Sequence, residues 1–396
     1  MALEMSWPSL SRLSAALAVA AAIFLLRGFF DRDEQSWLSP DSTRVAASSA
    51  PLFERNTVAQ GSAAERLHAP AIVDLGGDEL LAVWKYRGEA GDDDTRLYMA
   101  RFSNWQWAAP TLVTTAAATG EELGRYIFKL GNAVLLTRPN EELWLVYVST
   151  LGGWSTSQLN LKRSLDGGLT WSKSERLVTS PFFNLSTLVK TRPLELMNRA
   201  PVIPAYHEML AHLPELLFLN EAGRVRDKIR MGSAVGHLAI QPAVAVLSQH
   251  EVVAMMRPSG ATPRIFETRS KDGGRSWSLP ESTDLPNPGG PVGLVPANGR
   301  MLALVFNDDP EKERDLTLAV SIDSGSTWTK LATLDKLSEG EKGVLTYPFL
   351  IRSGDENYDL VYADSGKLAI RHIRFNDAWL DLMVKQASFS KANSAP

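Results

Sequence analysis

A six-bladed β-propeller is the fold that the sequence predicts, and three observations predict it. A motif with serine, aspartate, glycine and tryptophan at fixed offsets occurs as SLDGGLTW (164–171), SKDGGRSW (270–277) and SIDSGSTW (321–328). The motif aspartates lie 106 and 51 residues apart, so one repeat of about fifty residues with one lost copy accounts for both gaps. Hydrophobic strands separated by polar turns recur between the motifs. A four-strand repeat of this length, about six times over, is typical of a propeller.

The strand pairs follow one another along the chain at the spacing that the repeat requires. Each is a hydrophobic strand, a polar turn and a second hydrophobic strand, with the alternation expected of β-structure. Near residue 105 the sequence RFSNWQWAAPTLV keeps the tail of the motif without its Asp-Gly turn, which indicates a degenerate copy. The pairs lie at 69–86, 133–149, 242–257, 291–308 and 347–364.

The repeated motif predicts architecture rather than chemistry. An aspartate followed by glycine between two strands is a hairpin turn, in which the carboxylate binds its own turn backbone and glycine supplies the positive φ. A calcium loop would need more than the single carboxylate of each motif. The sequence HEMLAH places His207 and His212 five residues apart, whereas the zinc motif needs four. We therefore expect no metal and no cofactor.

The composition excludes some classes of partner. Hydrophobic residues make up 44% and charged residues 22% of the chain, and the formal net charge is −4. No run of lysine and arginine occurs, which argues against nucleic acid or an anionic membrane surface as the main partner. The absence of cysteine excludes disulfides and thiol catalysis.

The N-terminal segment predicts export from the cytoplasm. An uninterrupted apolar run at 13–26 lies between Arg12 and Arg27, and it is short for a membrane span but normal for a signal peptide. No small-x-small cleavage site follows promptly, so we favour an uncleaved signal anchor over 1–30, with a cleaved signal peptide as the alternative. A linker over 31–60, a propeller over 61–380 and a polar tail over 381–396 complete the expected organisation. The propeller would then lie in the bacterial cell envelope, periplasmic or extracellular, and attach to the inner membrane only through 13–26.

The motif resembles the Asp-box, or bacterial neuraminidase repeat, of the sialidase superfamily, over roughly residues 60–375. That resemblance implies a six-bladed propeller whose boxes lie on the face away from the substrate. It also implies an arginine triad for the substrate carboxylate, an aspartate acid/base, and a tyrosine nucleophile activated by glutamate.

The resemblance carries over to some positions and fails at two. His68, in HAP, stands where the family has its first arginine, and Gln241 stands where it has the activating glutamate. Glutamine cannot take a proton from a phenol, and histidine lacks the bidentate fork of arginine. The positions that match are the acid/base Asp93 (Asp92 or Asp94 is possible), the second arginine Arg257, the third arginine Arg314 and the nucleophile Tyr347.

A second stretch can compensate for these departures. Residues 198–231 and the loop TDLPNPGG (283–290) resemble a bacterial sialidase-like subgroup that we associate with polysaccharide gene neighbourhoods. Tyr206, His207 and Glu208 follow an apolar strand, and Glu208 can act as the acid or base that position 241 no longer supplies. We expect a sialidase-like exo-glycosidase acting on sialic acid or another acidic sugar of a glycan or polysaccharide. The alternatives are a non-catalytic glycan-binding propeller and a scaffold in a polysaccharide export machine.

Overall fold

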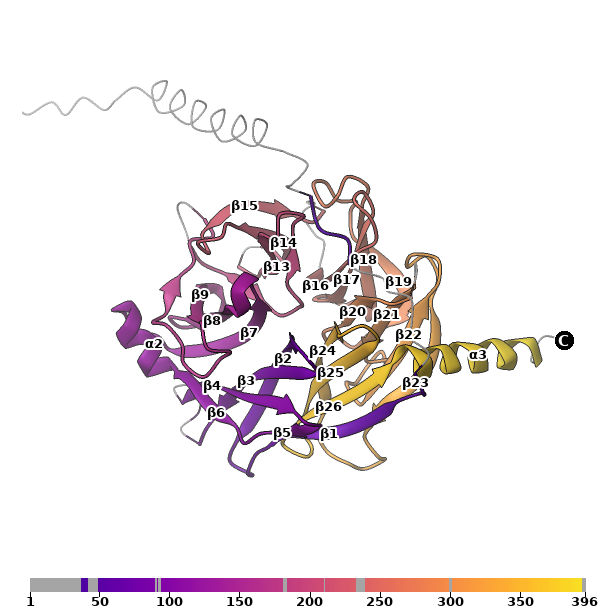
Figure 1. Ribbon diagram of the computed structural model, residues 1–396. Coiled ribbons are helices and arrows are strands. Elements are labelled where there is room, and N and C mark those ends of the chain that lie inside the picture. Colours follow the sequence, from indigo (N-terminus) through magenta and orange to yellow (C-terminus); the bar gives the residue numbers. More distant parts are fainter. Residues whose placement is uncertain are drawn as a thin grey trace, which may run out of the picture.

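Six antiparallel sheets stand around a central axis in the computed structural model, which confirms the predicted six-bladed propeller (Figure 1). The structure describes residues 37–41, 49–89, 91, 94–180, 184–209, 211–232, 239–298 and 301–393, and of 389–393 only the backbone. The predicted anchor at 13–26 lies outside the described residues.

The blades follow the chain, and the innermost strand of each begins at one end of the axis. Blade 1 is β2 (Arg66–Gly76), β3 (Glu79–Arg87), β4 (Thr95–Ser103) and β5 (Gln106–Trp107), with β6 (Thr111–Thr115) also paired to β4. Blade 2 is β7 (Lys129–Thr137), β8 (Leu143–Thr150), β9 (Ser157–Ser164) and β10 (Glu175–Arg176). Blade 3 is β11 (Thr187–Val189), β13 (Pro201–His207), β14 (Leu213–Leu219) and β15 (Val225–Arg230), with β12 (Leu194–Glu195) paired to β13.

The second half of the ring repeats the same order. Blade 4 is β16 (Ala239–Val246), β17 (Val252–Pro258), β18 (Arg264–Ser270) and β19 (Glu281–Pro286). Blade 5 is β20 (Gly293–Pro296), β21 (Leu302–Phe306), β22 (Asp315–Ser321) and β23 (Thr329–Lys336). Blade 6 is β24 (Leu345–Ser353), β25 (Asn357–Asp364), β26 (Ala369–Asn376) and β1 (Phe53–Gln60).

The ring closes by pairing the two ends of the propeller. Strand β1 pairs antiparallel with β26, with Phe53 opposite Phe375. The pairing covers the edge of β26, which would otherwise expose a row of free backbone groups. The propeller therefore begins at residue 53, inside the segment that the sequence predicted to be linker.

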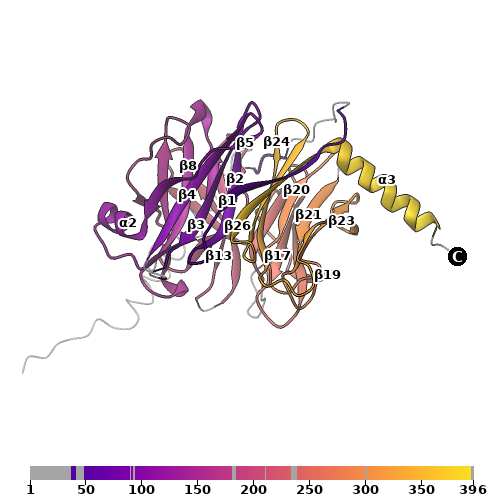
Figure 2. The ribbon, with the colours of Figure 1, turned by 90° about the horizontal axis from the view of Figure 1, so that it is seen from below.

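Within the described residues, two α-helices lie outside the blades: α2 (Ala116–Leu123) and α3 (Asp377–Asn393). The short 3₁₀ turns are η3 (Pro139–Glu141) and η4 (Trp154–Thr156). Helix α3 projects away from the blades (Figure 2) and occupies most of the segment expected to be a polar tail. It forms because Asn376 accepts the Trp379 N–H at 3.0 Å and Leu380 is buried. Among the described helices, none is long and apolar enough to cross a membrane.

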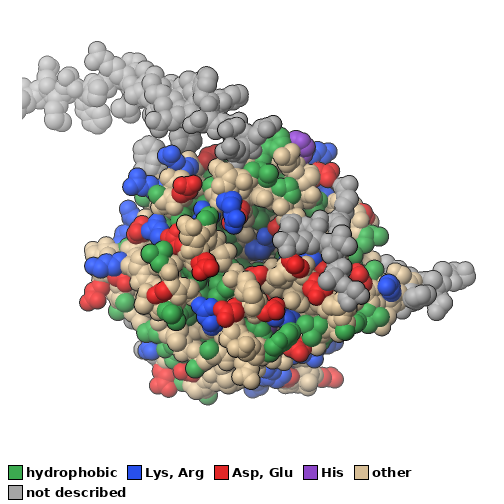
Figure 3. Space-filling view, in the orientation of Figure 1, with side chains coloured by type: hydrophobic (Ala, Val, Ile, Leu, Met, Phe, Trp, Pro, Cys, Tyr) green, Lys and Arg blue, Asp and Glu red, His purple; other side chains and the backbone are tan. Residues whose placement is uncertain are grey.

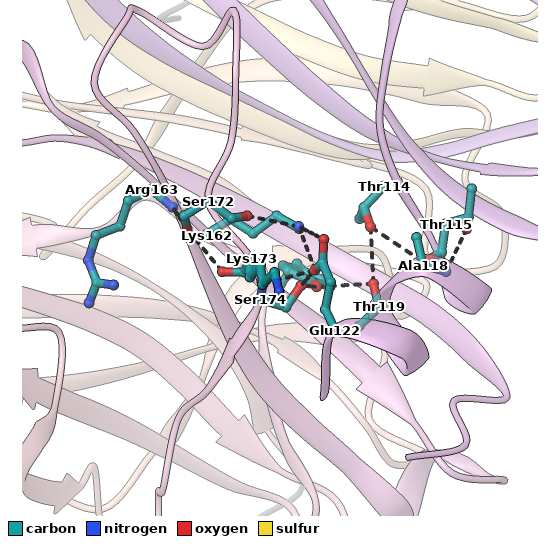
Figure 4. Close-up of polar contacts among 11 residues, drawn as sticks. Thr114, Thr115, Ala118, Thr119, Glu122, Lys162, Arg163, Ser172, Lys173 and Ser174 are labelled. Atoms are coloured by element: carbon teal, nitrogen blue, oxygen red, sulfur yellow. Dashed lines mark hydrogen bonds and ion pairs between the residues drawn. The ribbon is translucent and has the colours of Figure 1, made fainter. Parts of the chain in front are cut away.

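Helix α2 is fastened to blade 2 by a polar network (Figure 4). The Glu122 carboxylate accepts the Lys162 ammonium at 2.7 and 2.8 Å and the Ser174 N–H at 2.8 Å. The Lys162 side chain is only 3% exposed, so this ion pair satisfies a charge that water scarcely reaches. Thr115 caps the helix by accepting the Ala118 N–H at 3.0 Å.

The Asp-boxes brace hairpins, as predicted. In blade 2 the Ser164 hydroxyl donates to the Asp166 carboxylate at 2.7 Å, and the Thr170 N–H donates to it at 2.9 Å. The bonds from Thr170 and Ser164 lower the pKa of Asp166 to about 2. Gly168 has a φ of 94°, which only glycine adopts readily. The boxes of blades 4 and 5 repeat the serine–aspartate and backbone–aspartate bonds.

A strap formed by residues 37–41 (the N-terminal strap) lies on the Asp-box side of blades 3 and 4. Leu38 is fully buried and forms a β-bridge with Leu196. The Asp41 carboxylate pairs with Arg192 at 2.9 Å. The Trp37 ring lies 5.0 Å from the His250 ring, edge to face. The chain is thus held against the propeller ten residues after the predicted anchor.

Candidate functional site

The innermost strands of blades 1, 4 and 6 share one backbone distortion where they begin. Ala69, Gln241 and Tyr347 have φ values of 51°, 57° and 57°, and the register of each strand shifts at that point. Each of these residues precedes a proline, and a left-handed conformation at a residue with a side chain costs on the order of 1–3 kcal/mol. Because a bulge re-aims the side chains next to it, three blades direct residues toward one end of the axis. We call this end the axial mouth.

Five blades meet in direct contacts at the axial mouth. The rings of His68 and Tyr347, from blades 1 and 6, have centroids 4.2 Å apart. The Gln241 amide of blade 4 donates to the Tyr206 hydroxyl of blade 3 at 3.0 Å. Asn132 of blade 2 approaches the same hydroxyl at 3.5 Å and donates to the Val189 carbonyl at 3.1 Å. Four predicted site residues, at positions 68, 206, 241 and 347, therefore lie together.

Basic side chains surround His68. Burial, and after it the charges of Lys85, Lys190, Arg87 and Arg257, together lower the pKa of His68 to about 3. His68 is therefore a neutral imidazole at physiological pH, and the positive charge of the axial mouth comes from the basic side chains near it, of which Lys190 is only partly protonated at pH 7. These come from three blades: Lys85 and Arg87 from β3, Lys190 from the segment after β11, and Arg257 from β17.

The tyrosines of the mouth are neutral phenols. Burial is the main cause that raises the pKa of Tyr347, with Arg257 opposing it. Burial likewise raises the pKa of Tyr206. The Lys190 ammonium lies 5.5 Å from the Tyr347 ring centroid and 4.8 Å from that of Phe349. Burial lowers the pKa of Lys190 to about 7.

Two carboxylate side chains, those of Glu208 and Glu313, belong to the axial mouth. Burial raises the pKa of Glu208, while His212 and Arg257 oppose the shift. The Glu208 N–H donates to the Ser186 hydroxyl at 3.0 Å, which fixes the residue at the end of β13. Glu313, in the loop before β22, raises the pKa of Tyr347 by its charge. No group of three or more metal-ligating side chains occurs among the described residues.

Several polar atoms of the mouth are buried without a hydrogen-bond partner among the described residues. They are His68 Nδ1, Gln241 Oε1, Arg257 Nε and Glu313 Oε2. Leaving a buried donor or acceptor unpaired costs about 1–3 kcal/mol, so such atoms are rare in folded proteins. Their gathering at one place is what a polar ligand site requires, because the ligand supplies the missing partners.

The structure does not bring every predicted site residue to the axial mouth. The Arg314 guanidinium donates to the backbone carbonyls of Glu341 at 2.9 Å and Ser338 at 2.7 Å. His207 has charges of the outer strands β14 and β15 as its neighbours, chiefly Glu215 and Lys228. Asp92 and Asp93 lie outside the described residues, and Asp94 pairs with Arg96 at 2.7 Å.

Sequence reasoning missed Lys190 and Glu313. Lys190 directly follows the short apolar strand β11. A lysine at the end of an apolar run is the signal that could have identified it as a site residue. Glu313 lies in DDPEKERD, an acidic run that looks like a solvated turn, beside the arginine that the resemblance selected. Nothing local to that run distinguishes the residue that faces the mouth.

A second cavity lies at the opposite end of the axis, where the innermost strands finish. It has a volume of about 210 Å³, and Arg138, Arg192 and Arg352 line it together with Asp74 and Glu195. Figure 3 shows basic side chains around a central hollow of the molecule. Each arginine is already paired, with Glu195 at 3.7 Å, Asp41 at 2.9 Å and Asp377 at 2.7 Å respectively. The cavity therefore offers less net positive charge than its arginines suggest.

Solved sialidase structures are similar to the chain in fold. Sialidase Hz136 of Hadza microbial origin superposes with a TM-score of 0.63 at 18% identity, covering 78% of this chain and 65% of its own. The intramolecular trans-sialidase of Ruminococcus gnavus has a TM-score of 0.61 at 13% sequence identity, and the match covers 79% of this chain and 95% of the trans-sialidase chain. The NanB sialidase of Streptococcus pneumoniae has a TM-score of 0.62 at 10% sequence identity, and the match covers 81% of this chain and 70% of the NanB chain. At these identities the likeness concerns the fold.

In sequence, no curated protein matches the chain. The BNR repeat-like domain matches residues 78–366, which is most of the chain and includes all three Asp-boxes. Together with the six blades and the likeness to sialidase structures, this match assigns the chain to a family. The chain belongs to the BNR repeat-like domain family and is a sialidase-like propeller.

Proposed function

We propose that the chain is an exo-glycosidase acting on an acidic sugar, sialic acid or another, at the end of a glycan or bacterial polysaccharide. One observation carries the proposal: four basic side chains from three blades act on a single buried histidine at the axial mouth. A group of basic side chains of this kind attracts a carboxylate, and Arg257 offers the fork that binds one with two hydrogen bonds. The neutral His68 serves this binding as a hydrogen-bonding group.

The side chains of the axial mouth can supply the general acid and the nucleophile of a retaining glycosidase. Glu208, whose pKa burial raises, is suited to keep a proton and give it to the leaving oxygen. Tyr347 is the nucleophile, because a neutral phenol is not repelled by the substrate carboxylate as an anionic nucleophile would be. Asp93 remains the alternative acid, in the loop that also carries Asp94.

The second candidate function is glycan binding without turnover. Gln241 favours it, because its amide donates to Tyr206 and cannot accept a proton from Tyr347. The basic group of the mouth would then hold an acidic sugar of a cell-envelope polysaccharide without cleaving it.

We also propose that residues 13–26 anchor the chain in the inner membrane with the propeller outside the cytoplasm. The N-terminal strap supports a definite orientation for this arrangement. It attaches the chain to the Asp-box side of blades 3 and 4, through Leu38 and Asp41, soon after the predicted anchor. The axial mouth, at the other end of the innermost strands, would then face away from the membrane toward polysaccharide.

The deciding experiment measures turnover and binding on the same full-length protein in detergent. Disaccharides that end in sialic, glucuronic or galacturonic acid, whose leaving sugar needs a proton, are assayed for hydrolysis, and the free acidic sugars are assayed for binding by calorimetry. Hydrolysis of one of them that falls in Glu208→Gln but not in Glu339→Gln, an exposed control, supports the glycosidase. Binding without hydrolysis selects the second candidate, and neither binding nor hydrolysis refutes both.

A further inference from the structure

We infer that Glu313 is the group that receives the phenolic proton of Tyr347, so that this chain carries its general base on blade 5 and not at position 241. The inference rests on the proposed glycosidase function and adds a catalytic residue to it. It starts from the buried Glu313 Oε2 atom, which has no partner among the described residues.

The backbone ties Glu313 to the strand that carries the nucleophile. The Glu313 carbonyl accepts the Leu345 N–H at 2.8 Å, two residues before Tyr347. The buried Asn307 side chain donates to the Leu345 carbonyl at 2.9 Å and so ties blade 5 to the same residue. The loop before β22 and the start of β24 are therefore held together, and the positions of Glu313 and Tyr347 are fixed relative to each other.

The Glu313 carboxylate and the Arg257 guanidinium both lie near a pair of glycines. A Cβ built on Gly290 would lie 3.4 Å from Glu313 Cδ, and one on Gly289 would lie 3.9 Å from the Arg257 guanidinium. The acid and the arginine thus flank the same dipeptide of the loop 287–290. A Cβ at position 290 would also lie 2.3 Å from Asn307 Oδ1, so only glycine fits without a shift.

Among the described acids of the mouth, Glu313 is the better placed base for Tyr347. The charge of Glu313 acts on Tyr347 more strongly than that of Glu208. The charges that act on Glu208 are those of His212 and Arg257, and its pKa, which burial raises, suits it to donate a proton rather than to accept one. The two carboxylates therefore take opposite roles, as two groups in different environments do in other glycosidases.

The chemical step balances with the groups at hand. The Tyr347 oxygen forms a bond to the anomeric carbon while its O–H bond breaks, and the proton passes to Glu313, directly or through one water. The glycosidic C–O bond breaks, and its electron pair goes to the leaving oxygen, which Glu208 protonates. Water then attacks the anomeric carbon and gives a proton to Glu208, while the glycosyl–tyrosine bond breaks and Glu313 returns its proton to the Tyr347 oxygen. The sugar is released, and both carboxyl groups are back in their starting states.

The test compares Glu313→Gln with Glu311→Gln in the full-length protein. Glu311 lies two residues away in the same loop and is exposed, so it is a matched control. With the 4-methylumbelliferyl glycoside that the wild type cleaves best, we expect Glu313→Gln to lower kcat by about 10²–10⁴-fold with KM nearly unchanged. Glu208→Gln should lose less with this substrate, because its leaving group departs without a proton.

Each outcome decides between the roles. A kcat for Glu313→Gln within threefold of the control overturns the inference while the glycosidase proposal stands. A rise in KM at unchanged kcat overturns it too, because Glu313 would then only bind substrate. A wild type that binds the acidic sugars without cleaving them refutes the glycosidase, and with it a catalytic Glu313.

Discussion

Replacement of Arg257 by methionine tests the electrostatic account of the axial mouth. Arg257 lies on β17 opposite Ile240, and its Nε atom is buried without a partner among the described residues. The guanidinium lowers the pKa of His68 and of Glu208 by its charge. Methionine keeps the aliphatic stem and its packing while it removes the charge and the hydrogen-bonding fork.

The expected loss of affinity follows from what the guanidinium does. Removing one partner of a buried, hydrogen-bonded charge pair costs about 2–5 kcal/mol. A difference of 1.4 kcal/mol is tenfold in Kd, so we expect a Kd about 30- to several-thousand-fold higher for Arg257→Met. The same change removes a charge that lowers the pKa of Glu208, so that pKa should rise further.

The assay is isothermal titration calorimetry of the full-length protein with the acidic sugar that binds the wild type. Arg264→Met is the matched control, because Arg264 belongs to the same blade but is 47% exposed and pairs with Asp284 at 3.6 Å. Thermal unfolding of both variants checks that the propeller is intact. A Kd within twofold of the wild type in folded Arg257→Met would refute the reasoning, and so would an equal loss in the control.

Three further changes test the fold and the loop that borders the site. Glu122→Ala should lower the free energy of unfolding by about 3–5 kcal/mol in thermal unfolding, because it strands the buried Lys162 ammonium; unchanged stability would contradict this ion pair. Hydrogen bonds lower the pKa of Asp323 to about 2 from 3.8, so the stability it contributes is present above pH about 3.8 and disappears as pH falls toward 2. Asp323→Asn should flatten melting-temperature profiles over that window, and a profile parallel to the wild type would count against the turn bonds. Gly290→Ala should weaken sugar binding and also lower the melting temperature, because its Cβ would displace the buried Asn307 side chain that donates to the Leu345 carbonyl. A variant that binds and melts like the wild type would contradict this close approach.

Part of the candidate site could be predicted from the sequence, for identifiable reasons. The positions of Gln241 and Tyr347 are each marked by a following proline at the start of an innermost strand, and the structure places them in one group. Glu313 could not be selected over Arg314 in the same way. Adjacent residues of an extended segment point to opposite sides. A shift of one residue in the strand register would therefore direct Arg314 instead of Glu313 toward the mouth, and the sequence does not fix this register.

The sequence by itself determined the features that depend on neighbours along the chain. The Asp-box hydrogen bonds join residues at most four positions apart, and the fifty-residue repeat fixed the number of blades. Tertiary structure alone decided how the ring closes, with β1 beside β26, and which charges surround His68. Those charges come from three blades, and burial sets their effect. Pairing across more than 300 residues and the exclusion of water arise only when the whole ring is assembled.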